Sequence, residues 1–299
     1  MRVLPLFALA VLASLPLTQH VAAQAVKAPA APSAGKVGEP AVAEAMTIVY
    51  GAYNAQTEVS PWPEKTWGKF PYKSDSAEEI KVHPYYHVSF TENGVAKYLL
   101  LTWTRPYGSA ATDDEEDAVH ACHACGVTIG AAVLRQTDAG WKLEGSNLIL
   151  ELAGAWGEPP KTVLFQPIGP RHYGLILHQD LYWGGTVDRN HEVYLYTGTG
   201  FRKLFDTTYE DNADSVFCHE RLTKRYHSLG ETQAEEVASH LCVTSQETMQ
   251  FVPAAGSAFD EIRLTRQFPR YKNFGHRRVV LRYRYSKTSQ KYRPLQSPK

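Results

Sequence analysis

Short runs of alternating apolar and polar residues, each next to a tight-turn signal, constrain the fold of this chain most strongly. In residues 86–91 Tyr, Val and Phe alternate with His, Ser and Thr, and Asn93-Gly94 then leads into a second strand-like run, residues 95–104. Asn-Gly between two such runs is the strongest short-range signal for a β-hairpin, because both positions of a type I′ turn need a positive φ. The segment is therefore predicted to form a hairpin.

The same order of strand, polar turn, aromatic residue and return strand occurs in residues 131–143 and 192–205, and more loosely in residues 280–295. Two more strand-like runs lie at residues 162–165 and 173–177. The spacing between the units is unequal, so they do not indicate a repeat protein. Together they predict a mainly β fold of antiparallel meander hairpins, of sandwich or partial propeller-like type.

A few short helices are expected beside the strands. Residues 41–54 begin with apolar residues at helical spacing, and Ser228-Leu-Gly-Glu231 has the spacing of a capping box. Four apolar residues after that box share one helix face: Ala234, Val237, Ala238 and Leu241. The second helix is the better supported of the two, because a start signal and an apolar stripe occur together.

The first 25 residues have the pattern of a secretory signal peptide. Arg2 precedes an apolar run at residues 3–17, and small residues suited to signal peptidase follow at Ala23 and Ala25. No later apolar stretch approaches the roughly 20 residues of a membrane-spanning helix. We therefore expect an exported protein, periplasmic or secreted, with no transmembrane segment after signal cleavage, in a compartment where disulfides persist.

Composition divides the remaining chain into two parts. Residues 26–45 are rich in alanine, proline and glycine and have few large apolar side chains to bury, which is typical of a flexible linker. Residues 46–299 are long enough to bury a substantial core, as one β-rich domain or as two subdomains.

Charge is balanced overall but unevenly distributed. Residues 263–299 contain twelve Lys or Arg and no acidic residue, whereas residues 113–117 are all acidic. If residues 278–285 form a strand, Arg278, Arg282 and Arg284 share one face, opposite an apolar one. This face is expected to serve mainly to keep the surface soluble, or else to bind an anionic envelope polymer, lipid headgroups or an acidic protein; export argues against nucleic acid.

The segment His120-Ala-Cys122-His123-Ala-Cys125 combines the residue types of a metal site, a redox site and a disulfide. Thiolate and imidazole ligands at this spacing suit zinc or copper. A thiol–disulfide site is less favoured, because the residues after Cys125 are a poor helix start, and Gly126 in place of histidine excludes c-type haem attachment. If the segment is extended, the two sulfurs diverge, so only a turn lets them share a bond or an ion.

Structural disulfides are the favoured interpretation of the four cysteines. The simplest of the three pairings joins Cys122 to Cys125 and Cys218 to Cys242, although cross-pairing stays open. His83 and His87, four residues apart on a predicted strand, share a face if that strand is regular, and are expected either to face solvent or to bind a metal together.

No catalytic signature is present: the chain has no G-x-S-x-G, HExxH, Walker A or G-x-G-x-x-G motif. The leading hypothesis is therefore an exported, non-enzymatic β-rich protein that binds an envelope component or a protein partner. The alternatives are a periplasmic metal-binding protein that uses residues 120–125, and an enzyme of unknown class.

Overall fold

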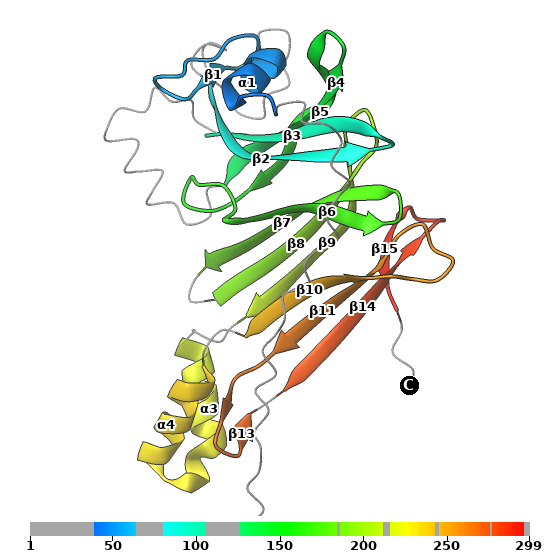
Figure 1. The fold of residues 1–299 in the computed structure, drawn as a ribbon. Coiled ribbons are helices and arrows are strands. Elements are labelled where there is room, and N and C mark those ends of the chain that lie inside the picture. Colours follow the sequence, from blue (N-terminus) through cyan, green and yellow to red (C-terminus); the bar gives the residue numbers. More distant parts are fainter. Residues whose placement is uncertain are drawn as a thin grey trace, which may run out of the picture. The chain divides into compact units, whose positions relative to one another are not determined.

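The computed structural model describes residues 39–63, 80–105, 126–183, 186–211, 216–242, 245–275 and 277–295. All of these residues belong to one compact unit, Glu39–Lys299. Within it the fold is mainly antiparallel β with short helices, as predicted. Figure 1 shows its strands grouped into successive sheets along the sequence.

Sheet A contains five strands in sequence order: β1 (Ser60–Pro61), β2 (Lys81–Glu92), β3 (Val95–Thr104), β4 (Val127–Thr137) and β5 (Gly140–Ala153). The Asn-Gly hairpin is confirmed, since Asn93 and Gly94 join β2 to β3 with φ values of 54° and 78°. Helix α1 (Val42–Tyr50) lies on one face of this sheet and ends at Gly51, which adopts the left-handed conformation.

Sheet B is a second meander of four strands: β6 (Thr162–Gly169), β7 (His172–Trp183), β8 (Thr186–Tyr196) and β9 (Phe201–Asp211). Sheet C contains β10 (Gln246–Val252), β11 (Glu261–Gln267), β14 (Arg278–Ser286) and β15 (Lys291–Pro294), and a small ribbon of β12 (Arg270–Tyr271) and β13 (Phe274–Gly275) connects β11 to β14. The predicted hairpins within residues 131–143, 192–205 and 280–295 are all present.

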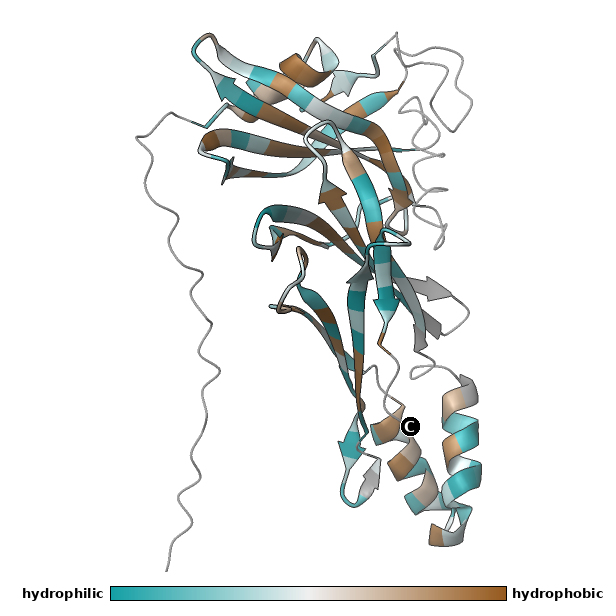
Figure 2. Ribbon diagram, turned by 90° about the vertical axis from the view of Figure 1, so that its right-hand side faces the viewer, coloured by the Kyte–Doolittle hydropathy of each residue, from teal (hydrophilic) through white to brown (hydrophobic). Residues whose placement is uncertain are grey.

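The three sheets stack face to face because apolar residues alternate along their strands (Figure 2). Leu99 and Leu101 of sheet A pack against Leu175 and Leu177 of sheet B. The opposite face of sheet B, which includes Ile176, packs in turn against sheet C. The order of layers is therefore α1, sheet A, sheet B, sheet C, and the outer face of sheet C carries no further layer among the described residues.

Close backbone contacts fix the sheets to one another. Asn147 of β5 accepts a hydrogen bond from the backbone N–H of Phe201, at 2.6 Å, where β9 begins. At Gly145 a Cβ atom would lie 2.3 Å from the backbone of Thr199, so this position between the sheets has no room for a side chain. The stacking therefore depends on glycine and polar contacts as well as on apolar burial.

A helical hairpin lies between sheets B and C in the sequence. It consists of α3 (Val216–Tyr226), a short 3-10 turn, η3 (His227–Leu229), and α4 (Glu231–Leu241). Ala234, Val237 and Ala238 are buried, as the predicted stripe requires. The predicted capping box is wrong: Ser228 lies in the 3-10 turn, and Gly230, with φ 90° and ψ 151°, is the N-cap without any side-chain hydrogen bond. Only glycine readily adopts that backbone conformation.

Candidate functional site

The outer face of sheet C carries a cluster of cationic side chains. Strand β14 alternates as predicted, with Leu281, Tyr283 and neighbouring apolar residues packed toward sheet B. Arg278, Arg282 and Arg284 are exposed on the other side. The three arginines singled out from the sequence therefore share one open face.

Neighbouring strands add further cations, which become apparent only from the strand register. Arg263 of β11 lies directly opposite Arg282, and Arg293 of β15 lies directly opposite Arg284. Lys291 of β15 is on the same face, opposite Ser286. We call this surface the basic face and define it by six residues: Arg263, Arg278, Arg282, Arg284, Lys291 and Arg293.

Like charges directly opposite each other destabilise a sheet, and the basic face contains two adjacent pairs of this kind. Sheet A also has a row of opposed cations, Lys97, Arg135 and Lys142. There, however, Lys97 forms ion pairs with Glu92 and Glu144. Among the described residues, the row on sheet A is thus compensated by two carboxylates, whereas one carboxylate forms ion pairs with the six cations of the basic face.

That single carboxylate belongs to Glu261, whose side chain is only 4% exposed. Arg282 donates two hydrogen bonds to it, from Nε at 2.6 Å and from Nη2 at 2.9 Å, and Arg284 lies 3.6 Å away. The hydrogen bond from Arg282, together with the charges of Arg284 and Arg263, holds the pKa of Glu261 below its usual value. Glu261 is therefore anionic, and the face keeps a net charge of about five positive at neutral pH.

The arginines of the basic face retain free donor capacity. The side chains of Arg282 and Arg284 are 51% and 55% exposed. Arg282 donates two of its N–H groups to Glu261, and its other N–H groups point away from that carboxylate. A guanidinium binds carboxylate and phosphate oxygens with paired hydrogen bonds. Chemically, the face is suited to binding oxyanions.

A buried polar network lies on the inner side of the same sheet, between sheets B and C. Glu247 of β10 is 1% exposed and accepts hydrogen bonds from His191 Nε2 and from Arg266 Nε. Burial alone would raise the pKa of Glu247, but the two hydrogen bonds outweigh it and the pKa falls below its usual value. The Nδ1 atom of His191 is 2.8 Å from that of His178, its partner across β7 and β8. This network cross-links two sheets.

A cluster between sheets A and B has a similar linking role. The ammonium group of Lys203 forms ion pairs with Glu151 and Glu192, and the hydroxyl of Tyr194 lies 2.6 Å from Glu151 and 2.9 Å from Glu192. Burial would lower the pKa of Lys203, but the two carboxylates raise it above its usual value. Every charge here has a partner, so we assign the cluster to structure.

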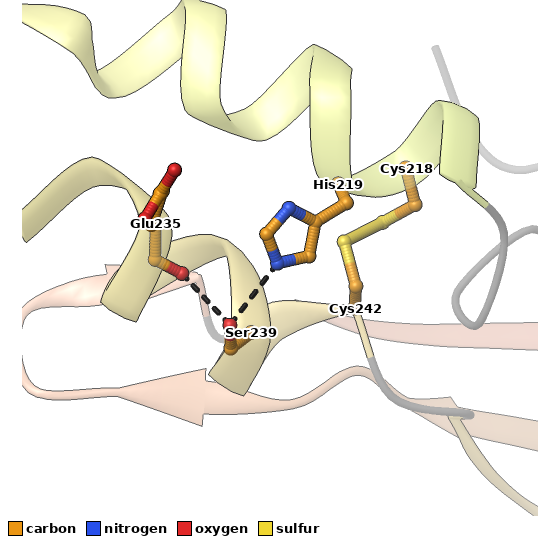
Figure 3. The surroundings of a disulfide bond; sticks show 5 residues. All are labelled: Cys218, His219, Glu235, Ser239 and Cys242. Atoms are coloured by element: carbon orange, nitrogen blue, oxygen red, sulfur yellow. Dashed lines mark hydrogen bonds between the residues drawn. A yellow bond between two sulfur atoms is a disulfide. The ribbon is translucent and has the colours of Figure 1, made fainter. Parts of the chain in front are cut away.

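The predicted pairing of Cys218 with Cys242 is confirmed: a disulfide joins the start of α3 to the end of α4 (Figure 3). Nearby, His219 Nε2 lies 3.0 Å from Ser239 Oγ, which donates to the carbonyl of Glu235. These two sulfurs are therefore not available as thiolate ligands. The candidate ligands His120, Cys122, His123 and Cys125, and with them the second predicted disulfide, lie outside the described residues.

A shared metal site of His83 and His87 is not formed, and the expectation that they share a face is wrong. A one-residue irregularity between Pro84 and Tyr86 shifts the register of β2 against β3. Such a bulge reverses the alternation of side chains, so His83 stacks on Trp103 and His87 on Tyr98, on opposite faces of the sheet. Among the described residues no group of three His, Cys, Asp or Glu side chains is arranged to hold a metal ion.

A pocket of about 300 Å³ lies beside α1 and β1, with Tyr53, Asn54 and Lys81 as its polar or charged lining residues. Its lining contains no carboxylate, histidine or cysteine. None of the helices in the described parts of the chain is both long and apolar enough to cross a membrane.

No protein-family model matches the chain, and neither a curated protein nor a solved structure is significantly similar to it.

Proposed function

We propose that this protein is a non-enzymatic binding protein that acts outside the cytoplasm and binds an anionic component of the envelope through its basic face. One observation carries the proposal. On an open sheet face, two arginines of β14 each lie directly opposite an arginine of a neighbouring strand, in the pairs Arg263–Arg282 and Arg284–Arg293. This arrangement costs folding stability. A bound anion would relieve the repulsion, and retention of a locally unfavourable arrangement is typical of a functional site.

Two features support a location outside the cytoplasm. Residues 1–25 have the pattern of a signal peptide, and the disulfide between Cys218 and Cys242 is of a kind that persists in oxidising compartments. Periplasmic and secreted locations agree equally well with both features. This part of the proposal is tested by recovering the protein from each compartment, measuring its mass and identifying its N-terminal residue.

Charge reversal tests the binding function. A variant with Arg278→Glu, Arg282→Glu and Arg284→Glu is compared with the wild type for cosedimentation with insoluble envelope material at physiological salt. We expect binding to be lost, because three of six cations become acidic, whereas the apolar residues of β14 that pack against sheet B lie on the opposite face and are unchanged. Circular dichroism of the variant confirms that the sheets are intact.

The matched control reverses three exposed cations away from sheet C: Arg135 and Lys142 on sheet A, and Arg171 in the turn between β6 and β7. It changes the net charge of the protein by the same amount, so non-specific attraction would weaken equally in both variants. Equal loss of binding in the two variants would contradict a role of the basic face, and so would full binding by the Arg278/Arg282/Arg284 variant.

A further inference from the structure

The cations of the basic face form a stripe along β14. Successive residues on one face of an antiparallel strand are about 7 Å apart, and neighbouring strands are about 4.8 Å apart. Ser286 with Lys291, Arg284 with Arg293 and Arg282 with Arg263 therefore occupy three consecutive positions.

The stripe continues past one neutral position to a further cation. Val280 faces Thr265 at the neutral position, and Arg278 faces Gln267 at the last one. The five positions span about 27 Å, and four of them carry at least one positive charge.

Glu261 holds the middle of the stripe in place. Its carboxylate is nearly inaccessible to solvent and binds Arg282 through two hydrogen bonds, with Arg284 3.6 Å away. A guanidinium that is already fixed in one orientation loses less conformational freedom when a ligand binds. Glu261 is thus a positioning residue, which lowers the net charge of the face but orders its central arginines.

We propose that the ligand of the basic face is a linear polyanion that lies along β14 and places successive anionic groups against the arginine pairs. This inference rests on the proposed function above. A single small anion would use one pair and leave the rest of the stripe unneutralised. A lipid surface fits less well, because Val280 is the single large apolar side chain exposed among the described residues of this face.

Varying the length of the ligand distinguishes binding of a polyanion from binding of a small anion. Binding to the full-length exported protein is measured with galacturonic acid and with its four-unit and eight-unit oligomers. Inorganic polyphosphate of similar length serves as the phosphate counterpart. We expect the affinity to rise at least tenfold from monomer to octamer, since each added contact neutralises a further cation. The oligomer class that binds more tightly identifies the anionic group as carboxylate or phosphate.

Two substitutions test the positions of the arginines. Arg282→Ala should weaken octamer binding about tenfold and make the slope of log K against log salt shallower by about one, as for loss of one ionic contact. Glu261→Gln should weaken binding about threefold although it makes the face more positive. Simple attraction predicts the opposite for Glu261→Gln, so tighter binding of the octamer would overturn its positioning role. Arg135→Ala is the control, with unchanged affinity.

The remaining outcomes separate this inference from the proposed function. If galacturonic acid and its octamer bind equally, or if phosphatidylglycerol vesicles bind and neither oligomer series does, the polyanion is wrong while anion binding by the face stands. If none of these anionic probes binds and the Arg278/Arg282/Arg284 reversal leaves envelope binding intact, the proposed function itself fails.

Discussion

Sheet C contains two glutamate–arginine pairs on its opposite faces, and they are predicted to differ strongly in their contribution to stability. In the inner pair, Glu247 is 1% exposed and Arg266 10% exposed. In the outer pair, Glu261 is 4% exposed but Arg282 is 51% exposed. Each glutamate is changed to glutamine, which keeps the size of the side chain and removes its charge.

The loss of stability expected for Glu247→Gln depends on which groups the substitution leaves buried without a charged partner. Glu247 accepts two hydrogen bonds from groups that can carry charge, His191 and Arg266, and bonds of this kind contribute about 1.5–3 kcal/mol each. Glutamine keeps one acceptor oxygen, but Arg266 loses its counterion within the sheet interface, a loss that typically costs about 3–5 kcal/mol. We therefore expect about 3 kcal/mol of destabilisation, which lowers Tm by roughly 6–12 °C for a domain of this size.

Glu261→Gln should cost less than about 1 kcal/mol, because Arg282 can turn toward water when its partner loses charge. Thermal unfolding followed by circular dichroism at pH 7 measures both variants. Equal losses, or a loss below 1 kcal/mol for Glu247→Gln, would refute the view that the inner network cross-links the sheets.

The pH dependence of the same variant has a definite sign. Because the pKa of Glu247 in the folded protein is below its usual value of 4.5, its contribution is complete above about pH 4.5. That contribution falls as the pH drops through the folded pKa. The stability difference between wild type and Glu247→Gln should therefore shrink in acid, and a difference that grows there would contradict the assignment.

Three further predictions concern the other structural features. Replacing Cys218 and Cys242 by serine should lower the free energy of unfolding by about 3.5 kcal/mol, the value that the chain-entropy model gives for a loop whose ends are 24 residues apart. Urea unfolding measures this loss, and an unchanged midpoint would mean that the bond does not constrain the hairpin. Gly145→Ala should cost about 1–3 kcal/mol, since a Cβ there clashes with the backbone of the next sheet, and a neutral effect in the same assay would show that the sheets can separate locally. For residues 120–125 the metal hypothesis predicts bound zinc or copper and free thiols in native mass measurement, whereas four oxidised cysteines without metal would end it.

Local features of the fold were predictable because they depend on neighbours in the sequence. Asn93-Gly94 specifies a turn through backbone sterics alone, and alternation along residues 278–285 places the arginines on one face in any antiparallel sheet. The failures are also local. The bulge beside Pro84 separates His83 from His87, and the conformation of Gly230 displaces the expected cap.

The complete candidate site required the register between strands. Arg263 and Arg293 join the basic face only because β11 and β15 pair with β14 in one specific alignment. Glu261 just precedes the acid-free tail, and nothing in its sequence neighbourhood distinguishes a positioning carboxylate from a solvated one. Long-range pairing of this kind is fixed by the packing of whole sheets, which a single sequence does not display.

The most direct test of the account is to observe the arginine side chains while a polyanion binds. In an NMR titration with the galacturonate octamer, or with polyphosphate if that binds more tightly, we expect the Nε–H resonances of Arg263, Arg282, Arg284 and Arg293 to shift together with one affinity. The resonances of Arg135 and Arg171 should stay in place. Shifts confined to arginines outside sheet C, or no shift of the four at saturating ligand, would contradict the central claim that the basic face is the binding surface.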